Sequence, residues 1–258
     1  MFPYIELLGV KISTFSLLIL IALFTTITVY IKSPMYPKMY LLDLMKKIVP
    51  VLIGTAVGVR LLSAITMMSV SNKPFWYNLL FGGAVFYGGV IGGCASLAII
   101  CAIKKQPFLE YTDVFVSLLP LGHAIGRFGC YLNGCCYGCK YDGPFAVSYP
   151  IDGELVEVFP TWFIEILFCI LLFIFFQFVY KTKIRGRRTA IYFITYSCYR
   201  FVIEYARGDD IRGIWGHLST SQIISLLTLL FGITVLLYSN QNKKQNYMII
   251  KENTINEL

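Results

Sequence analysis

The chain is poor in charged residues and in histidine, and each shortage excludes a class of protein. Charged residues make up only 14% of its 258 residues, whereas hydrophobic residues make up 57%. This balance excludes an ordinary soluble domain and indicates a polytopic membrane protein. Only two histidines are present, which excludes a histidine-rich metal site. The sequence also has no low-complexity tract or internal repeat, and its first apolar run is too long for a cleavable signal peptide.

Long apolar runs account for most of the chain. Each is close to the roughly 20 residues that a helix needs to cross the hydrocarbon layer of a bilayer. The runs cover residues 12–31, 50–70, 79–103, 109–127, 161–180, 189–206 and 218–238. The sequence therefore predicts an all-α integral membrane protein with seven transmembrane helices, formed by residues 1–258 as a single domain.

The positive charges are distributed unevenly over the loops that join these runs. Of the 22 lysines and arginines, 14 lie in the first, third and fifth loops and the tail, and five lie on the opposite side. The positive-inside rule then places the N-terminus outside, the tail 239–258 in the cytoplasm and a loop region at 128–160 outside. Topology and contact with anionic lipid explain the net charge of +8, so no nucleic-acid partner is expected.

Three arginines remain inside the apolar runs, and Arg127 is the most informative. It stands among glycines and directly precedes an asparagine and a cysteine cluster. An arginine at membrane depth costs about 2.5–3.5 kcal/mol on insertion scales, so it marks a functional site. Glycines allow backbone N–H groups to approach a ligand closely. An anionic lipid headgroup is the expected ligand.

A second charged group lies in the sixth run. Arg200, Glu204 and Arg207 are spaced i, i+4 and i+7, which places them on one stripe of a helix. One interpretation is a set of ion pairs near the interface, with Arg207 reaching toward water. The functional interpretation is that Glu204 orients Arg200 toward a phosphate.

Three further residues are candidates with weaker signals. Arg60 follows the small residues of 54–58, which favour close helix packing, and we expect it to pair with an intramembrane carboxylate such as Glu165. Glu165 is explained either by the dipole at a helix start or by inward pairing with an arginine. Tyr87 stands in a glycine-rich run and either anchors the helix or places a hydroxyl for substrate binding or proton transfer.

Four of the eight cysteines form the pattern C-x4-C-C-x2-C in the predicted external loop. They are Cys130, Cys135, Cys136 and Cys139. Three interpretations are open, namely a zinc site, a disulfide, and free thiols lining a polar cavity. We favour free thiols over structural zinc because the cluster lacks a second, separated ligand pair. If one thiol is reactive, Arg127 and Lys140 would lower its pKa.

Several ordered motifs resemble those of the prolipoprotein diacylglyceryl transferase family of bacterial membrane enzymes. The run Gly-Arg-Phe-Gly-Cys-Tyr-Leu-Asn-Gly-Cys-Cys-Tyr-Gly at 126–138 resembles the signature G-R-x-G-N-F-x-N-x-E-x-x-G. The run at 159–165 resembles H-P-[ST]-Q-x-Y-E, and the run at 200–209 resembles R-F-x-x-E-x-x-R-x-[PD]. Residues 54–60 resemble the family's G-A-R element, and 218–225 resemble the start of its last helix. The resemblance spans nearly the whole chain.

The chain departs from the family pattern at several positions. Cys130 stands for the signature asparagine and Cys135 for the signature glutamate, while Tyr87 replaces the histidine of an H-G-G motif. Phe159 and Trp162 replace the histidine and glutamine of the second motif. The chain therefore resembles a divergent, cysteine-rich branch in which the phosphate-binding elements are better kept than the acid–base ones.

The resemblance implies transfer of the diacylglyceryl group of phosphatidylglycerol to a lipobox cysteine thiol of a prolipoprotein, in the bacterial inner membrane. Glycerol phosphate would leave, and no metal or diffusible cofactor is implied. It assigns the phosphate to the catalytic arginines Arg127 and Arg200, with Tyr87 as a candidate for proton handling. The substrate-binding candidates are Arg127, Asn133, Gly138, Glu204, Arg207, Arg60, Cys130 and Cys135.

Three alternatives to this function are open from the sequence. One is a lipid transferase of the same fold that acts on another nucleophile, including a transient lipid adduct on a loop cysteine. Another is a membrane thiol–disulfide oxidoreductase that uses Cys136 and Cys139. The third is a lipid-binding or transport protein without turnover.

Overall fold

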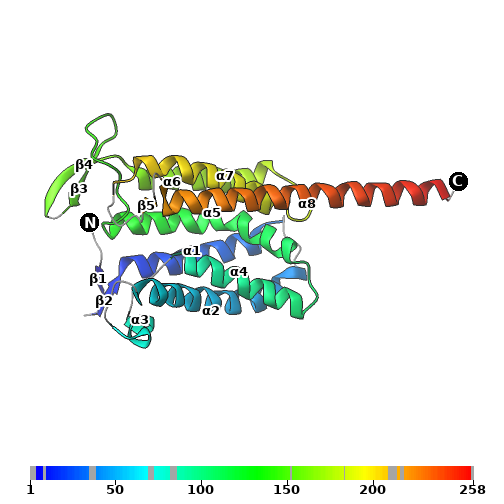
Figure 1. Cartoon of the computed structure of the whole chain (residues 1–258), viewed down its shortest axis with the longest axis horizontal. Helices are drawn as coiled ribbons and strands as arrows, with labels where there is room; N and C mark the ends of the chain where they lie inside the picture. Colours follow the sequence, from blue (N-terminus) through cyan, green and yellow to red (C-terminus); the bar gives the residue numbers. More distant parts are fainter. Residues whose placement is uncertain are drawn as a thin grey trace. The chain divides into compact units, whose positions relative to one another are not determined.

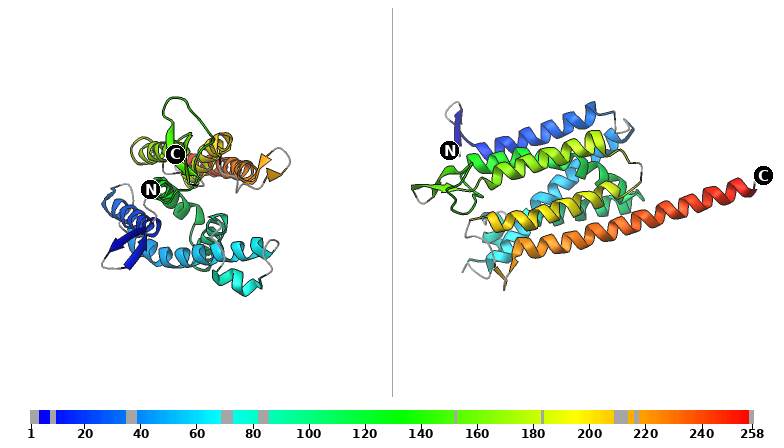
Figure 2. Two further views of the ribbon diagram at one scale, coloured as in Figure 1. Left: turned by 90° about the vertical axis from the view of Figure 1, so that its left-hand side faces the viewer. Right: turned by 90° about the horizontal axis from the view of Figure 1, so that it is seen from above.

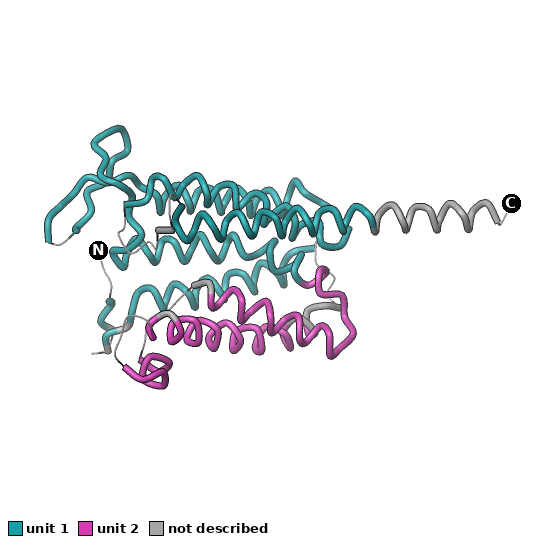
Figure 3. Tube along the Cα trace, viewed as in Figure 1, with its two compact units in different colours: residues 1–35, 112–258 teal, residues 36–111 magenta. Residues whose placement is uncertain are grey.

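The structure is a computed structural model, and it is mostly helical (Figure 1). It describes the backbone of residues 4–7, 10–34, 39–68, 73–81, 86–151, 153–182, 184–208, 214–215 and 218–256. The chain divides into two compact units, shown in teal and magenta in Figure 3. Unit 1 comprises Met1–Met35 and Thr112–Leu258, and unit 2 comprises Tyr36–Tyr111.

Unit 2 is built on a close pair of helices. It contains α2 (Met39–Met68), the short α3 (Phe75–Phe81) and α4 (Phe86–Ile103). A Cβ atom added to Gly58 would lie 2.1 Å from the Gly88 carbonyl oxygen, and one added to Gly92 would lie 2.1 Å from the Gly54 carbonyl oxygen. Only glycine permits two helix backbones to approach this closely. The predicted close packing at Gly54 and Gly58 is therefore confirmed.

Unit 1 holds the remaining helices. These are α1 (Thr14–Lys32), α5 (Phe108–Leu132, of which Thr112 onward belongs to this unit), α6 (Thr161–Ile174), α7 (Arg187–Ile203) and α8 (Thr220–Asn256). The helix α6 continues as a π-helical turn, η1 (Phe175–Val179), and α7 continues as a 3₁₀ turn, η2 (Glu204–Ala206). Helices α7 and α8 run side by side in Figures 1 and 2, and the Ser197 and Thr228 hydroxyls hydrogen-bond between them at 2.8 Å.

The core of unit 1 lies where α5, α6 and α7 meet. Val116, Leu172, Phe176 and Tyr192 are buried there and are surrounded by further aromatic side chains. Asp113 on α5 fixes the start of α7, because its carboxylate accepts hydrogen bonds from the Gly186 N–H at 2.7 Å and the Thr189 N–H at 2.8 Å. The carboxylate thus satisfies N–H groups that a helix start leaves without partners.

Three short antiparallel strand pairs complete unit 1. They are β1 (Tyr4–Leu7) with β2 (Val10–Ser13), β3 (Val147–Ile151) with β4 (Glu154–Val158), and β5 (Ile214–Trp215) with β6 (Leu218–Ser219). In the β3–β4 hairpin, Tyr149 pairs with Val156, and Tyr149 is fully buried. This hairpin lies in the predicted external loop region and connects α5 to α6.

Helices occupy parts of all seven predicted apolar segments. Among the described residues, five helical segments are long and apolar enough to cross a membrane, and the apolar part of α4, Gly88–Ile103, is shorter. The five are Thr14–Lys32, Met45–Ile65, Phe108–Leu132, Thr161–Val179 and Thr220–Gln241. Helix α7 is more polar because it buries side chains such as Arg188 and Arg200 within the protein. The chain is a helical, multi-pass membrane protein; seven spans and the orientation stay predictions.

Candidate active site

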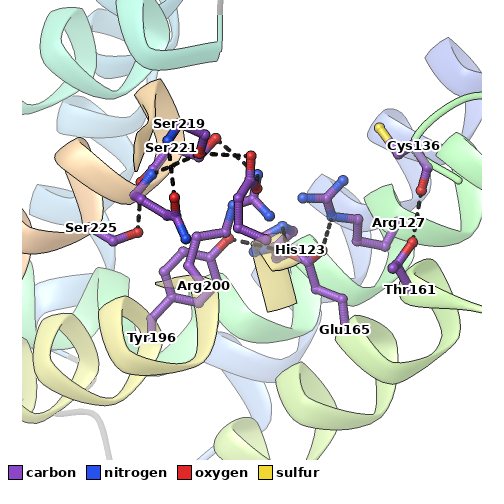
Figure 4. A network of polar contacts seen from close by, with 12 residues as sticks. His123, Arg127, Cys136, Thr161, Glu165, Tyr196, Arg200, Ser219, Ser221 and Ser225 are labelled. Atoms are coloured by element: carbon purple, nitrogen blue, oxygen red, sulfur yellow. Dashed lines mark hydrogen bonds and ion pairs between the residues drawn. The ribbon is translucent and has the colours of Figure 1, made fainter. Parts of the chain in front are cut away.

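Glu165 is the centre of a polar cluster inside unit 1, drawn in Figure 4. Its carboxylate Oε2 lies 2.8 Å from the Arg127 Nε, and its Oε1 lies 3.4 Å from the His123 Nε2. The Tyr196 hydroxyl donates a hydrogen bond to Oε1 at 3.1 Å. The Glu165 side chain is only 4% exposed, so its charge requires these partners. Helices α5, α6 and α7 thereby converge on one carboxylate.

This cluster decides between the interpretations of Glu165. The inward pairing with an arginine is confirmed, and the arginine is Arg127. Arg60 was the partner that the sequence suggested. In the structure Arg60 belongs to unit 2, where its Nη1 donates to the Leu80 carbonyl oxygen at 3.4 Å. His123 and Tyr196 carried no functional signal in the sequence, because the partner that each contacts lies on another helix.

A second arginine is held in the same manner at the end of α7. The Arg200 Nη2 lies 2.8 Å from the Glu204 Oε2 and donates to the Ser221 Oγ at 3.1 Å. The Ser219 hydroxyl donates to the other oxygen of Glu204 at 2.9 Å. The predicted pairing of Arg200 with Glu204 is confirmed, and it fits both interpretations of this group. The serines were not among the predicted site residues.

The start of α8 explains why the serines are in place. The Ser219 N–H donates to the Gln222 Oε1 at 2.9 Å, and the Gln222 N–H donates to the Ser219 Oγ at 3.2 Å. This reciprocal arrangement is a capping box, which satisfies donors at the helix start. It fixes the serine hydroxyl that binds Glu204, and the adjacent Ser221 turns toward Arg200. The S-x-x-Q pattern at 219–222 is the sequence signal by which this cap could have been found.

In both arginines, part of the guanidinium group lies outside the pair with glutamate. Glu165 binds Arg127 through Nε, and Figure 4 shows the two terminal nitrogens of Arg127 directed away from that carboxylate. The Arg200 Nη1 is buried and has no hydrogen-bond partner among the residues that the structure describes. The side chains of Arg127 and Arg200 are 14% and 9% exposed. Charge-assisted donors in such a dry environment bind an oxyanion strongly.

The loop after α5 brings three thiols together. The sulfur atoms of Cys130, Cys135 and Cys136 all lie within 4.8 Å of one another. Cys139 is exposed and is not a member of this group. All eight cysteines are free thiols, and the cluster offers three sulfur ligands where structural zinc uses four. No disulfide joins these cysteines, and the choice between free thiols and a metal site stays a prediction.

Hydrogen bonds from neighbouring elements hold this loop in place. The Tyr149 hydroxyl of β3 donates to the Cys135 carbonyl at 3.0 Å, and the Thr161 hydroxyl at the start of α6 donates to the Cys136 carbonyl at 3.0 Å. The backbone of Cys136 has a φ of 61°, in the left-handed region that non-glycine residues seldom adopt. The surrounding contacts therefore determine an unfavourable conformation at Cys136.

The charges around the loop thiols separate their acidities. Hydrogen bonding with Cys130 and Cys135, together with the positive charges of Arg127 and Arg207, holds the pKa of Cys136 far below its usual range, although burial acts in the opposite direction. A hydrogen bond with Cys130 lowers the pKa of Cys135, but its hydrogen bond to Cys136 and its burial together raise that pKa overall. Arg207 is a second cation that acts on Cys136.

Gly138 joins the three sequence motifs in space. It pairs with Arg207 in an antiparallel bridge, and the Gly208 N–H donates to the Tyr137 carbonyl at 3.2 Å. A Cβ atom at Gly138 would lie 2.2 Å from the Phe159 carbonyl oxygen. The loop thus lies directly against the end of α7 and the entry to α6. This close approach gives a physical reason for glycine at this position.

The remaining predicted residues are Asn133, Arg60 and Tyr87. Asn133 is exposed, directly after the end of α5. Arg60 borders an open, apolar pocket of about 500 Å³ within unit 2, formed with Ala56, Val57, Leu61, Leu79 and Leu80. Tyr87 falls in the first turn of α4, but its side chain lies outside the described residues.

Fold and site together define a helical, multi-pass membrane protein with two buried arginine–glutamate pairs. Comparison with known proteins gives the family. The chain belongs to the prolipoprotein diacylglyceryl transferase family, whose family model matches residues 3–238.

Relatives from several bacteria carry one name, phosphatidylglycerol–prolipoprotein diacylglyceryl transferase. The chain is 35% identical over 189 residues to the protein of Clostridium tetani, covering 71% of this chain and 76% of the relative. It is 34% identical over 245 residues to the second such protein of Clostridium perfringens, covering 92% and 94%. It is 30% identical over 220 residues to the protein of Listeria monocytogenes, covering 78% of each chain.

Proposed function

We propose that this chain transfers the diacylglyceryl group of phosphatidylglycerol to the lipobox cysteine thiol of a prolipoprotein and releases glycerol phosphate. Membership of the family and the shared name of the relatives support the reaction. The chain is accordingly a transferase. In this reaction a carbon–sulfur bond forms as the bond between the glyceryl carbon and the phosphate oxygen breaks. The phosphate gains negative charge as it leaves.

Arg127 and Arg200 bind that phosphate in our proposal. The observation that carries this assignment is that each guanidinium group contacts a glutamate through only some of its nitrogen atoms. A glutamate holds one edge, and the other edge keeps N–H donors for a ligand, including the buried Arg200 Nη1. Donors that are fixed before the reaction stabilise developing charge without reorganisation. Glu204 and Glu165 act as positioning residues, and Gly138 brings Arg207 and the thiol loop to the same place.

The acyl chains of the lipid lie, in this proposal, in an apolar groove between α5 and α6. The groove has a volume of about 260 Å³ and is formed by Leu121, Ala124, Ile125, Phe128, Ile166 and Ile170. Phe128 directly follows Arg127, and Ile166 directly follows Glu165. A lipid bound here would place its headgroup beside the arginine pair while its chains stay in apolar surroundings. We further propose that the headgroup side of the bound lipid is contacted by Asn133, Cys130 and Cys135. The proposal also includes substrate binding by Arg60 and proton transfer by Tyr87.

The activity is tested by incubating the purified, detergent-solubilised protein with phosphatidylglycerol and a lipobox peptide. Mass spectrometry should detect a diacylglyceryl thioether on the peptide together with free glycerol phosphate. Phosphatidylethanolamine with the same acyl chains and a peptide with serine in place of the cysteine are the matched controls. Folded protein that binds phosphatidylglycerol but forms no thioether would refute the transferase proposal and leave lipid binding without turnover.

The orientation in the bacterial inner membrane is proposed from the loop charges. The exposed Arg185 lies between α6 and α7 on the predicted cytoplasmic side, and the exposed Glu154 begins β4 on the predicted external side. In intact cells a membrane-impermeant maleimide should label the cysteine of Glu154→Cys, and it should label that of Arg185→Cys only after the cells are opened. Labelling is resolved by site with mass spectrometry, because the chain also has native free thiols. Labelling of residue 185 from outside would overturn the orientation.

A further inference from the structure

Three sulfur atoms lie together in the loop after α5, and neither arginine–glutamate pair involves them. The Sγ atoms of Cys130, Cys135 and Cys136 all lie within 4.8 Å of one another. Two sulfur ligands of one tetrahedral zinc ion lie about 3.8 Å apart, because each Zn–S bond is about 2.3 Å long. Rotation of the side chains that closes the group by at most about 1 Å therefore places all three sulfur atoms around one ion.

The end of helix α5 brings these cysteines together. The Cys135 N–H donates to the Cys130 carbonyl oxygen at 3.1 Å. The Gly134 N–H donates to the Tyr131 carbonyl oxygen at 3.2 Å, and Gly134 adopts the left-handed conformation with a φ of 75°. These two bonds form a Schellman motif. The motif turns the chain back over the last turn of the helix, so that Cys135 and Cys136 return to Cys130.

Protein groups hold the backbone of this loop without help from a ligand. The Tyr149 hydroxyl donates to the Cys135 carbonyl oxygen at 3.0 Å. The Thr161 hydroxyl donates to the Cys136 carbonyl oxygen at 3.0 Å, and Figure 4 shows the Cys136 sulfur turned away from Thr161. The Cys135 thiol itself donates weakly to the Cys130 carbonyl oxygen at 3.4 Å, and a metal would replace that proton. The loop is therefore formed before any metal binds.

The number of ligands distinguishes two kinds of zinc site. A structural site is closed by four protein ligands, whereas a catalytic site has three and keeps its fourth position for water or substrate. Among the residues that the structure describes, no histidine or carboxylate joins the three thiols. Cys139 is exposed and lies outside the group. The three thiols are only partly buried, so a further ligand can reach them. The cluster thus has the ligand set of an open site.

The cysteines lie where the chain departs from its family. Cys130 and Cys135 stand for the asparagine and the glutamate of the family signature, and Tyr87 stands for a motif histidine. Three thiolates and Zn²⁺ carry one net negative charge, which the cationic Arg127, one turn before Cys130 in α5, partly offsets. The chain therefore has metal ligands where it lacks acid–base residues of the family pattern.

We propose that Cys130, Cys135 and Cys136 bind one zinc ion and that its fourth position binds the lipobox thiol. The second part rests on the proposed function. Coordination removes the proton of the lipobox thiol, and this proton passes to water. The zinc-bound sulfur attacks the glyceryl carbon, and the carbon–oxygen bond to phosphate breaks with its electron pair on the leaving glycerol phosphate. The neutral thioether then leaves the ion and water returns, so zinc stays Zn²⁺ throughout.

Cobalt binding tests the three-thiolate site without any reaction. The reduced, detergent-solubilised full chain is treated with a chelator, and Co²⁺ is then titrated without oxygen. Thiolate-to-cobalt absorption should saturate at one equivalent per chain and disappear when Zn²⁺ is added. Circular dichroism should be the same with and without metal, because protein hydrogen bonds hold the loop. Zinc whose removal unfolds the chain would show a structural site and overturn the proposal.

Cys136→Ser and Cys139→Ser are a matched pair, because each replaces one sulfur by oxygen in the same loop. Cys139→Ser should bind zinc as the wild type does. Cys136→Ser should bind it more than about 100-fold more weakly, since even changes to groups behind a metal ligand cost roughly 10–100-fold. Equal zinc affinity of the two variants, or a wild type without thiolate-to-cobalt absorption, would overturn the site.

The lipobox peptide tests the fourth position. Added to the cobalt-loaded wild type at pH 7, the cysteine peptide should increase the thiolate-to-cobalt absorption, because a fourth thiolate joins the three of the protein. The peptide with serine in place of cysteine should leave the spectrum unchanged. Cys136→Ser with Co²⁺ and the cysteine peptide controls for cobalt bound by the peptide alone. An unchanged spectrum with the cysteine peptide would overturn the open position.

Transfer rates test the role of the ion in the reaction. A free cysteine thiol with a pKa of about 8.5 is about 3% ionised at pH 7 and about three-quarters ionised at pH 9. Metal-free wild type should therefore lose roughly 30-fold in rate at pH 7 and little at pH 9, and one equivalent of zinc should restore the rate. Full activity without metal, or an equal deficit at both pH values, would overturn this role. If the zinc-loaded wild type forms no thioether, the transferase proposal fails, while the cobalt titration still decides the metal site.

Discussion

Replacement of Arg127 by lysine tests the phosphate site without removing its charge. Arg127 uses Nε for Glu165 at 2.8 Å, and in our proposal its terminal nitrogens bind the phosphate. Lysine has a single nitrogen, so an ammonium group that pairs with Glu165 cannot also present the two-pronged donor geometry of arginine. The variant separates the two tasks that one guanidinium performs.

The expected loss follows from the contacts that disappear. Removing one charge-assisted donor from a developing oxyanion costs about 2–4 kcal/mol of transition-state stabilisation, or roughly 30- to 1000-fold in rate. The fold should persist in Arg127→Lys because the buried Glu165 keeps a cationic partner. In contrast, Arg127→Ala leaves that carboxylate without its guanidinium, which costs about 3–5 kcal/mol of stability. Arg127→Ala is therefore the less informative variant.

The assay measures initial rates of thioether formation by mass spectrometry and the unfolding temperature by tryptophan fluorescence. Arg185→Lys is the matched control, because it makes the same exchange at an exposed loop residue, and it should leave both quantities unchanged. Arg200→Lys should behave as Arg127→Lys does, since Glu204 and Ser221 already occupy one edge of Arg200. If Arg127→Lys unfolds at the wild-type temperature and transfers lipid within three-fold of the wild-type rate, the phosphate model is wrong.

Three further predictions concern stability and metal. Gly138→Ala should unfold at a clearly lower temperature than the wild type, because its Cβ would lie 2.2 Å from the Phe159 carbonyl oxygen. Gly126→Ala is the matched control: a Cβ there has nothing within 4 Å, so this variant should unfold at the wild-type temperature or slightly above. Asp113→Asn should destabilise the protein by about 1–3 kcal/mol in chemical denaturation, because an amide oxygen accepts more weakly than the carboxylate that caps α7. Chelators should leave the fold intact, and stoichiometric zinc whose removal unfolds the protein would contradict the expectation that the loop cysteines are not a structural zinc site.

Local features of the sequence were sufficient for the helices and for one ion pair. Apolar runs near 20 residues predicted segments that are helical in the structure, because a backbone in lipid must satisfy its hydrogen bonds within each segment. The pairing of Arg200 with Glu204 was predictable because residues four apart share one helix face. The burial of polar side chains on α7 was not predictable, since it depends on neighbouring helices that surround them.

The tertiary structure decided which distant residues meet. The sequence required a partner for Glu165 but could not choose among the arginines, and packing of α5 against α6 and α7 brought it Arg127, His123 and Tyr196. The sequence was consistent with zinc, a disulfide or free thiols at the loop cysteines. In the structure, the left-handed backbone at Cys136 and the hydrogen bond from Thr161 to its carbonyl fix the loop that carries these thiols. Sequence by itself determined the membrane helices, the resemblance to the family and the arginines, because hydropathy and motif spacing act locally. Only the fold determined how each charge is held and which thiols share a site, because those contacts join residues far apart along the chain.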